Sequence, residues 1–150
     1  MKINGKNIYI VASTFYDELS DQLIKGAIKE IELEDLQWFK NQKNIIKVPG
    51  AFEIPAMVKH LLDNKNPDLI ITLGVIIKGE TNHFEQISEF VFESISKLTM
   101  SSGVPISFGV ISALNYKQAQ ERALISKRNK GAEVASAGLK MLKLYEQYKK

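Results

Sequence analysis

Apolar positions along this chain follow two different patterns, and the alternation between them predicts the fold class. Continuous apolar runs, which are typical of buried strands, lie at residues 7–12, 45–48, 69–75 and 106–110. Helices are predicted between and after these runs, at residues 16–32, 55–62, 116–123 and 130–148, together with a long helix whose apolar face runs over residues 84–98 and which ends at residues 101–103. Strands that alternate with helices predict an α/β fold, in which a mostly parallel sheet is covered by helices on both faces.

Length and composition predict a single domain over residues 1–150. Hydrophobic residues make up 45% of the chain and charged residues 25%, which is typical of a globular protein with one full-sized core. No internal repeat, low-complexity stretch or linker interrupts the pattern. Residues 34–44 fit neither periodicity, so we assign them to neither class.

Charge and cysteine content disfavour nucleic-acid binding and exclude cysteine-based chemistry. The net charge of +3 is mild, and no basic stripe interleaved with aromatic residues predicts nucleic-acid binding. The chain has no cysteine, which excludes disulfides, cysteine nucleophiles and thiolate metal sites and fits a reducing compartment. Because neither a signal peptide nor a membrane-length apolar run is recognisable, we expect a cytoplasmic protein without a membrane partner.

The segment Gly74–Glu85 carries the strongest functional signal, because it joins the third strand to a helix. In open α/β sheets, ligands bind at the carboxyl ends of strands. There Thr81 can donate a hydrogen bond to a phosphate, and His83 can exchange protons near neutral pH. The spacing of Asn82 and Glu85 also predicts a capping box, so a purely structural interpretation of Thr81, Asn82 and His83 stays open.

Other strand ends carry candidate binding residues with two interpretations each. Phe15 follows the first strand and is either a stacking platform for a flat heterocycle or a hydrophobic staple. Glu53 lies in the rigid turn 48–55, where it either accepts hydrogen bonds from ligand hydroxyls or stabilises a helix N-terminus. Arg122 suits bidentate phosphate binding, although surface arginines are usually solvated. His60 lies on a helix face without such context and is predicted to be solvated.

Four segments together resemble the 6,7-dimethyl-8-ribityllumazine synthase family of riboflavin synthesis. They are residues 48–55, residues 74–83, residues 105–109 with 118–123, and residues 129–131, and their order and spacing match over nearly the whole chain. The resemblance implies a three-layer, flavodoxin-like fold with four parallel strands in the order 2-1-3-4. It also implies a transferase that condenses 5-amino-6-ribitylaminouracil with 3,4-dihydroxy-2-butanone 4-phosphate, giving 6,7-dimethyl-8-ribityllumazine, phosphate and water. Neither a metal nor a cofactor is expected.

The resemblance further implies a role for each candidate residue. His83 matches the residue that transfers protons. The residues that match the surroundings of the four-carbon substrate's phosphate are Glu80, Thr81, Arg122 and Lys130. Glu80 would contribute only its backbone, because its carboxylate repels the anion. The residues that match the pyrimidine site are Phe15, Ala51, Phe52, Glu53, Val75, Ile76, Ile77 and Phe108. Three of the matched residues, Phe108, Arg122 and Lys130, would come from a neighbouring subunit.

We therefore expect a homo-oligomer with shared sites, a pentamer, with riboflavin synthase as a further candidate partner. Small residues of the last helix, Ala132, Ala135, Ser136 and Gly138, form a face that would permit close helix packing between subunits. The chain begins close to its first strand, and the loop 124–128 departs from a glycine-rich family pattern, so a free pentamer is expected rather than a larger shell. Two alternatives remain open: a non-catalytic flavin- or lumazine-binding shell protein, and a signalling receiver domain. The receiver domain is disfavoured because residues 73–75 at the third strand's end lack an acidic residue.

Overall fold

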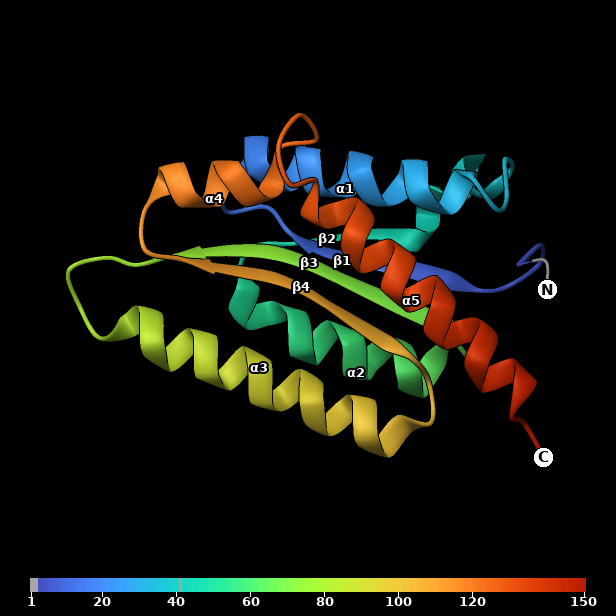
Figure 1. Cartoon of the computed structure of the whole chain (residues 1–150). Helices are drawn as coiled ribbons and strands as arrows, with labels where there is room; N and C mark the ends of the chain where they lie inside the picture. The colour runs from blue at the N-terminus through green and yellow to red at the C-terminus, as the bar shows by residue number, and fades with distance from the viewer. Residues whose placement is uncertain (1–2, 41) are drawn as a thin grey trace.

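The computed structural model describes residues 3–40 and 42–150, and in them four parallel strands lie between two layers of helices (Figure 1). The strands are β1 (Ile8–Ser13), β2 (Ile45–Val48), β3 (Leu69–Ile77) and β4 (Ile106–Ala113). They pair in the order β2-β1-β3-β4, with Ile10 opposite Ile45, Ile8 opposite Leu69 and Ile70 opposite Ile106. The predicted fold class and strand order are confirmed.

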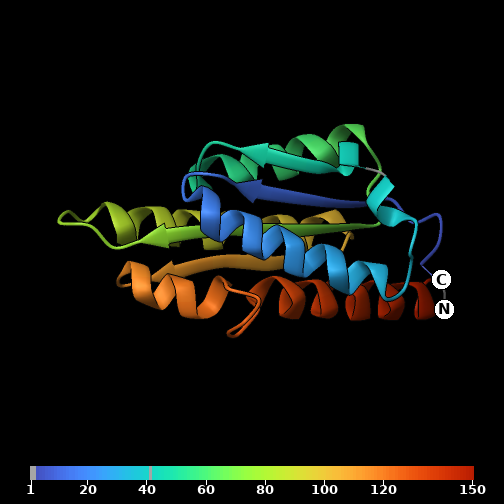
Figure 2. The same cartoon turned by 90° about the horizontal axis from the view of Figure 1, so that it is seen from above.

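Helices cover both faces of this sheet. One face lies under α1 (Asp17–Glu32), α4 (Tyr116–Ala123) and α5 (Lys130–Gln147), which Figure 2 shows from above. The other face lies against α2 (Ile54–Asn64) and α3 (His83–Ser102) (Figure 1). Within the described residues, no helix is both long and apolar enough to cross a bilayer.

Alternating side chains of the strands fill the two cores. In β1, Ile8, Ile10 and Ala12 pack with the α1 and α5 layer, while Tyr9 and Val11 pack with the α2 and α3 layer. Successive side chains of a strand point to opposite faces, so a strand covered on both sides must be apolar throughout. This explains why the strands appear as continuous apolar runs in the sequence.

Most element boundaries agree with the predicted ones, and the differences have physical reasons. β3 and β4 extend to Ile77 and Ala113, beyond the predicted ends at 75 and 110, because their pairing continues through Ile76–Ser112 and Ile77–Ala113. Ser112 is exposed at this edge strand, so its polarity does not end the strand. The unassigned segment contains two short 3-10 helices, Trp38–Lys40 and Gln42–Asn44, and the first of them buries the Trp38 ring in the core.

The carboxyl ends of the strands gather at one edge of the sheet, and both chain termini lie towards the opposite edge (Figure 1). The loops that follow β1, β2 and β3 therefore begin close together. In parallel α/β sheets this edge is where ligands bind.

Candidate active site

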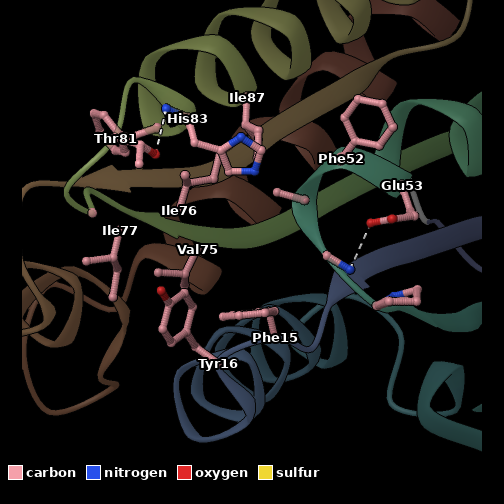
Figure 3. A pocket seen from close by; sticks show the side chains of 15 residues that line it. Phe15, Tyr16, Phe52, Glu53, Val75, Ile76, Ile77, Thr81, His83 and Ile87 are labelled. Atoms are coloured by element: carbon pink, nitrogen blue, oxygen red, sulfur yellow. Dashed lines mark hydrogen bonds between the residues drawn. The ribbon is translucent and has the colours of Figure 1, made fainter.

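A cavity of about 430 Å³ lies at the carboxyl ends of β1 and β3 and beside the turn after β2 (Figure 3). Nine of the predicted site residues line it: Phe15, Ala51, Phe52, Glu53, Val75, Ile76, Ile77, Thr81 and His83. Segments that are far apart in the sequence meet here because the parallel strands end at the same edge. The volume falls within the range of small-molecule sites.

His83 is the first residue of α3, and its imidazole points towards the cavity, beside Ile76 and Ile87 (Figure 3). The backbone N–H of His83 donates to Thr81 Oγ1 at 3.3 Å. The ring is exposed, so it can reach a bound molecule and exchange protons with it.

The predicted capping box at Asn82 and Glu85 is wrong. Asn82 lies at the N-cap position, but its side chain makes no capping hydrogen bond, and its φ of −69° and ψ of 4° lie outside the extended region that capping side chains use. Thr81 supplies a hydroxyl acceptor one residue earlier. The Glu85 carboxylate pairs with Lys78 instead, with 3.2 Å between Nζ and Oε1.

This ion pair ties the start of the loop after β3 to the first turn of α3. A hydrogen bond from its own backbone and then one from Lys78 hold the pKa of Glu85 below its ordinary value. Glu80 is exposed between Gly79 and Thr81, and its side chain does not line the cavity. A Cβ at Gly79 would meet nothing within 4 Å, so packing within the chain does not require a glycine there.

Glu53 faces the same cavity from the short helix Ala51–Glu53, which leads into α2 (Figure 3). Its Oε2 accepts from the backbone N–H of Gly50 at 3.0 Å, and its own N–H donates to the Gly50 carbonyl at 3.2 Å. Two reciprocal bonds fix the turn, and Oε1, which has no hydrogen-bond partner among the described residues, can accept from a ligand hydroxyl. Both interpretations of Glu53, helix start and ligand acceptor, are compatible with this geometry.

Aromatic side chains form two walls of the cavity. Phe15 is 74% exposed and packs edge-on against Tyr16, with 5.0 Å between ring centroids. Phe52 stacks on Phe90 of α3 at 4.8 Å. The sequence did not identify Tyr16, although its place beside Phe15 was a usable signal. Phe84 and Ile87 also border the cavity, and the sequence did not identify them as site residues.

Three further predicted site residues lie on the β4 side and do not line this cavity: Phe108, Arg122 and Lys130. Phe108 and Lys130 line a separate cleft of about 300 Å³ between α3, β4 and α5. Lys130 Nζ bonds Glu133 Oε1 at 2.7 Å. Arg122 lies in the last turn of α4 and lines neither space. A single chain therefore does not bring these residues to His83.

The cavity is suited to a flat, polar, uncharged molecule more than to an anion. It offers aromatic faces, one carboxylate and one imidazole, and no lysine or arginine lines it among the described residues. A phosphate bound there would meet hydroxyl, imidazole and backbone N–H groups from this chain, but no ammonium or guanidinium group. Elsewhere in the described chain, no cluster of three or more His, Cys, Asp or Glu side chains is arranged to hold a metal ion.

Comparison with known proteins identifies the family. A profile described as 6,7-dimethyl-8-ribityllumazine synthase matches residues 5–146. The chain belongs to the 6,7-dimethyl-8-ribityllumazine synthase family. It is 41% identical over 145 residues to the protein of that name from Leuconostoc mesenteroides, covering 97% of this chain and 92% of the relative. The protein from Limosilactobacillus reuteri is 38% identical, with 97% and 93% covered. The one from Thermococcus kodakarensis is 36% identical, with 97% and 90% covered.

The family match confirms the resemblance seen in the motifs. The matched residues 5–146 contain both the segments that line the cavity at β1–β3 and the β4 side with α4 and α5. The predicted site residues therefore all lie within the region that matches the family. In the fold of a single chain, one group of them lines the cavity, and the group Phe108, Arg122 and Lys130 lies on the β4 side.

Proposed function

We propose that this chain condenses 5-amino-6-ribitylaminouracil with 3,4-dihydroxy-2-butanone 4-phosphate, releasing 6,7-dimethyl-8-ribityllumazine, phosphate and water. Membership of the lumazine synthase family supports this activity. The observation that carries it is the cavity itself, in which Phe15, Glu53 and His83 converge from three separate segments. An aromatic face suits the pyrimidine, a carboxylate suits its ribityl hydroxyls, and an imidazole suits the proton transfers.

The reaction combines two additions of nitrogen to carbon with proton transfers and the departure of small molecules. The amine of the pyrimidine attacks the ketone, and water leaves to give an imine. Phosphate is then eliminated, the product tautomerises, and the ribitylamino nitrogen closes the second ring with loss of water. In this proposal His83 moves the protons, and the enclosing walls hold two substrates together, so proximity contributes much of the rate.

The phosphate-binding cations are proposed to come from a neighbouring copy of the chain. The cavity provides no guanidinium or ammonium group from its own described residues, whereas a phosphate is best held by such groups. Arg122 and Lys130 lie on the β4 side. A neighbour that presents its β4 side to this cavity would supply both cations and Phe108.

Exposed apolar side chains support such an interface. Phe92 of α3 is 57% exposed and packs edge-on against Phe108 at 5.4 Å, while Phe52 and Phe90, which are also exposed, stack on each other beside the cavity. Exposed clusters of large apolar side chains mark contacts between proteins. A contact between the cavity side of one copy and the β4 side of the next is head-to-tail. Such contacts repeat from copy to copy, and they form a ring when the rotation between copies closes. The family resemblance favours five copies, with a cytoplasmic location and riboflavin synthase as a partner.

The small-residue face of α5 does not support this ring. A Cβ at Gly138 would overlap Ser107 Oγ, and Ala135 is buried in the chain's own core. The face expected to pack between subunits is therefore used within the chain, against its own sheet.

A direct assay tests the proposed activity. The purified chain is mixed with both substrates, and lumazine fluorescence and released phosphate are followed together, with each substrate omitted in turn. We expect lumazine and phosphate to appear in equal amounts when both substrates are present, and much faster with the chain than in the slow reaction of the substrates alone. Binding of lumazine without turnover would overturn the proposal in favour of a non-catalytic lumazine-binding protein.

A further inference from the structure

The first turn of α5 rests on α1 with almost no space between them. A Cβ at Gly131 would overlap the backbone carbonyl oxygen of Leu23. A Cβ at Gly26 would overlap Asn129 Oδ1 and stand only 3.2 Å from the backbone nitrogen of Ala132. The two helices can meet this closely because both contact positions lack a side chain.

The connection that leads into α5 is held against the same surface of α1. The backbone N–H of Ile125 donates to Gln22 Oε1 at 3.2 Å. Asn129, with a left-handed φ of 48°, directs its N–H to the Leu124 carbonyl at 3.1 Å, and its own carbonyl accepts from Ala132 at 3.1 Å. Its Oδ1 is buried and has no hydrogen-bond partner among the described residues. Since no hydrogen bond orients Asn129 Oδ1, this atom is positioned by its packing against Gly26.

Lys130 is the residue between these two contacts. Asn129 precedes it and rests on Gly26, and Gly131 follows it and rests on Leu23. The position of the Lys130 backbone is thus set by a surface of α1 that is more than a hundred residues earlier in the chain. The exposed pair with Glu133 orients the ammonium group but does not place its backbone.

We infer that Gly26 is a positioning residue for Lys130, and that it acts on phosphate binding by fixing where α5 begins. The inference rests on the proposed function, in which Lys130 helps hold the phosphate of the four-carbon substrate. A methyl group at position 26 would displace the Asn129 side chain and lift the first turn of α5. The Lys130 ammonium group would then approach the phosphate less closely, while the pyrimidine side of the cavity, built from β1–β3, would be unaffected.

The test is a double-mutant cycle of Gly26→Ala and Lys130→Ala, with steady-state constants measured for both substrates. Gly26→Ala alone should raise KM for the four-carbon phosphate roughly tenfold, because a contact with a charged group is weakened. KM for the pyrimidine should change by less than about twofold. In the Lys130→Ala background, Gly26→Ala should have no further effect on KM, because the group on which it acts is gone.

Rescue and control variants separate positioning from general crowding. Asn129→Gly removes the side-chain atoms that a methyl at position 26 would overlap and leaves only the approach to the Ala132 nitrogen, and glycine accepts the left-handed backbone there. Adding Gly26→Ala to Asn129→Gly should therefore raise KM much less than Gly26→Ala does in the wild type. Gly138→Ala is the matched control on the same helix. Its Cβ would overlap Ser107 Oγ, so it should lower thermal stability without separating the two KM values. If Gly26→Ala does not fold, Gln22→Ala removes the bond to Ile125 and should raise the same KM roughly two- to threefold.

The outcomes distinguish this inference from the proposed function. An inactive wild-type chain would overturn the proposed function and this inference with it. An active wild type whose Gly26→Ala variant, or Gln22→Ala in its place, changes both KM values equally or neither would overturn the inference alone. A Gly26 effect that persists undiminished without Lys130 would also overturn it, because Gly26 would then act through another group.

Discussion

The cavity side and the β4 side of this sheet carry the predicted site residues in opposite ways. On the cavity side, Phe15, Glu53 and His83 approach one another from three segments and enclose a space. On the β4 side, Phe108, Arg122 and Lys130 lie outside that space, and Phe108 packs against the exposed Phe92 of α3. The first group encloses a cavity, whereas the second group does not converge on one space within a single chain.

Under the proposed function, this difference means that one chain carries two complementary halves of a site that is completed between copies. The cavity side offers aromatic faces, a carboxylate and an imidazole, while the β4 side offers the cations that an anionic substrate needs. If the two halves meet only between copies, substitutions on each side should affect different constants.

The largest effect is expected on the cavity side, at His83. His83→Ala should lower kcat by about 10²–10⁴-fold, the usual contribution of general acid–base catalysis, and leave both KM values nearly unchanged. Rates are measured after subtraction of the slow reaction in solution. His60→Ala is the matched control, because His60 is the second histidine and is exposed on α2. Wild-type turnover in the His83→Ala variant would remove His83 from the mechanism.

The next largest effect is expected on the β4 side, at Arg122. Loss of a charge-assisted contact should raise KM for the four-carbon phosphate roughly 10- to 100-fold in Arg122→Ala, with a much smaller change for the pyrimidine. Arg128→Ala is the control, since Arg128 is exposed in the following turn. Steady-state kinetics with each substrate varied in turn give the answer. Equal shifts in both KM values would mean that Arg122 is structural.

A smaller effect is expected where the two halves would meet. Phe92→Ala should weaken assembly by about 1–2 kcal/mol, which raises the concentration needed for half-assembly roughly 5- to 30-fold. Leu36→Ala is the control, because Leu36 is 86% exposed but lies on the connection to β2. Sedimentation over a range of concentrations measures the change. Unchanged assembly in Phe92→Ala would place the interface elsewhere.

The smallest effect is expected at the ion pair of Lys78 and Glu85, which lies at the rim of the cavity side. Because the pKa of Glu85 is lowered in the folded chain, its ionised form stabilises the fold above the ordinary value of 4.5, and this contribution is lost as the pH falls through the folded pKa. Glu85→Gln should therefore melt slightly below wild type at about pH 7, with the difference closing in acid. A difference in melting temperature that widens in acid would contradict the assignment.

The order of elements along the chain and the cavity side could be predicted from local patterns, whereas the strand order 2-1-3-4 was implied by the family resemblance. Strands buried on both faces are apolar throughout, and the helices between them are amphipathic, so the order of elements was readable. Parallel strands bring their carboxyl ends to one edge, and this placed Phe15, Glu53 and His83 near one another.

Other features depend on contacts that no local pattern reveals. The extra residues of β3 and β4 follow from their pairing, and the Lys78–Glu85 pair replaced the capping box predicted at Asn82. The close contact of Gly26 with Asn129 joins segments about a hundred residues apart. The small residues of α5 are another example. The sequence shows that this helix face permits close packing, but not whether it packs against the chain's own sheet or against another subunit.

The central claim, that the two halves of the site meet between copies, is tested most directly by mixing two inactive variants. His83→Ala and Arg122→Ala chains are unfolded together in equal amounts and refolded, and formation of mixed assemblies is verified. If each site combines His83 of one copy with Arg122 of the next, about a quarter of the sites in random mixed rings contain both intact residues, and activity should recover to about that fraction of wild type. No recovery in verified mixed rings, or full activity in a wild-type monomer, would contradict the account.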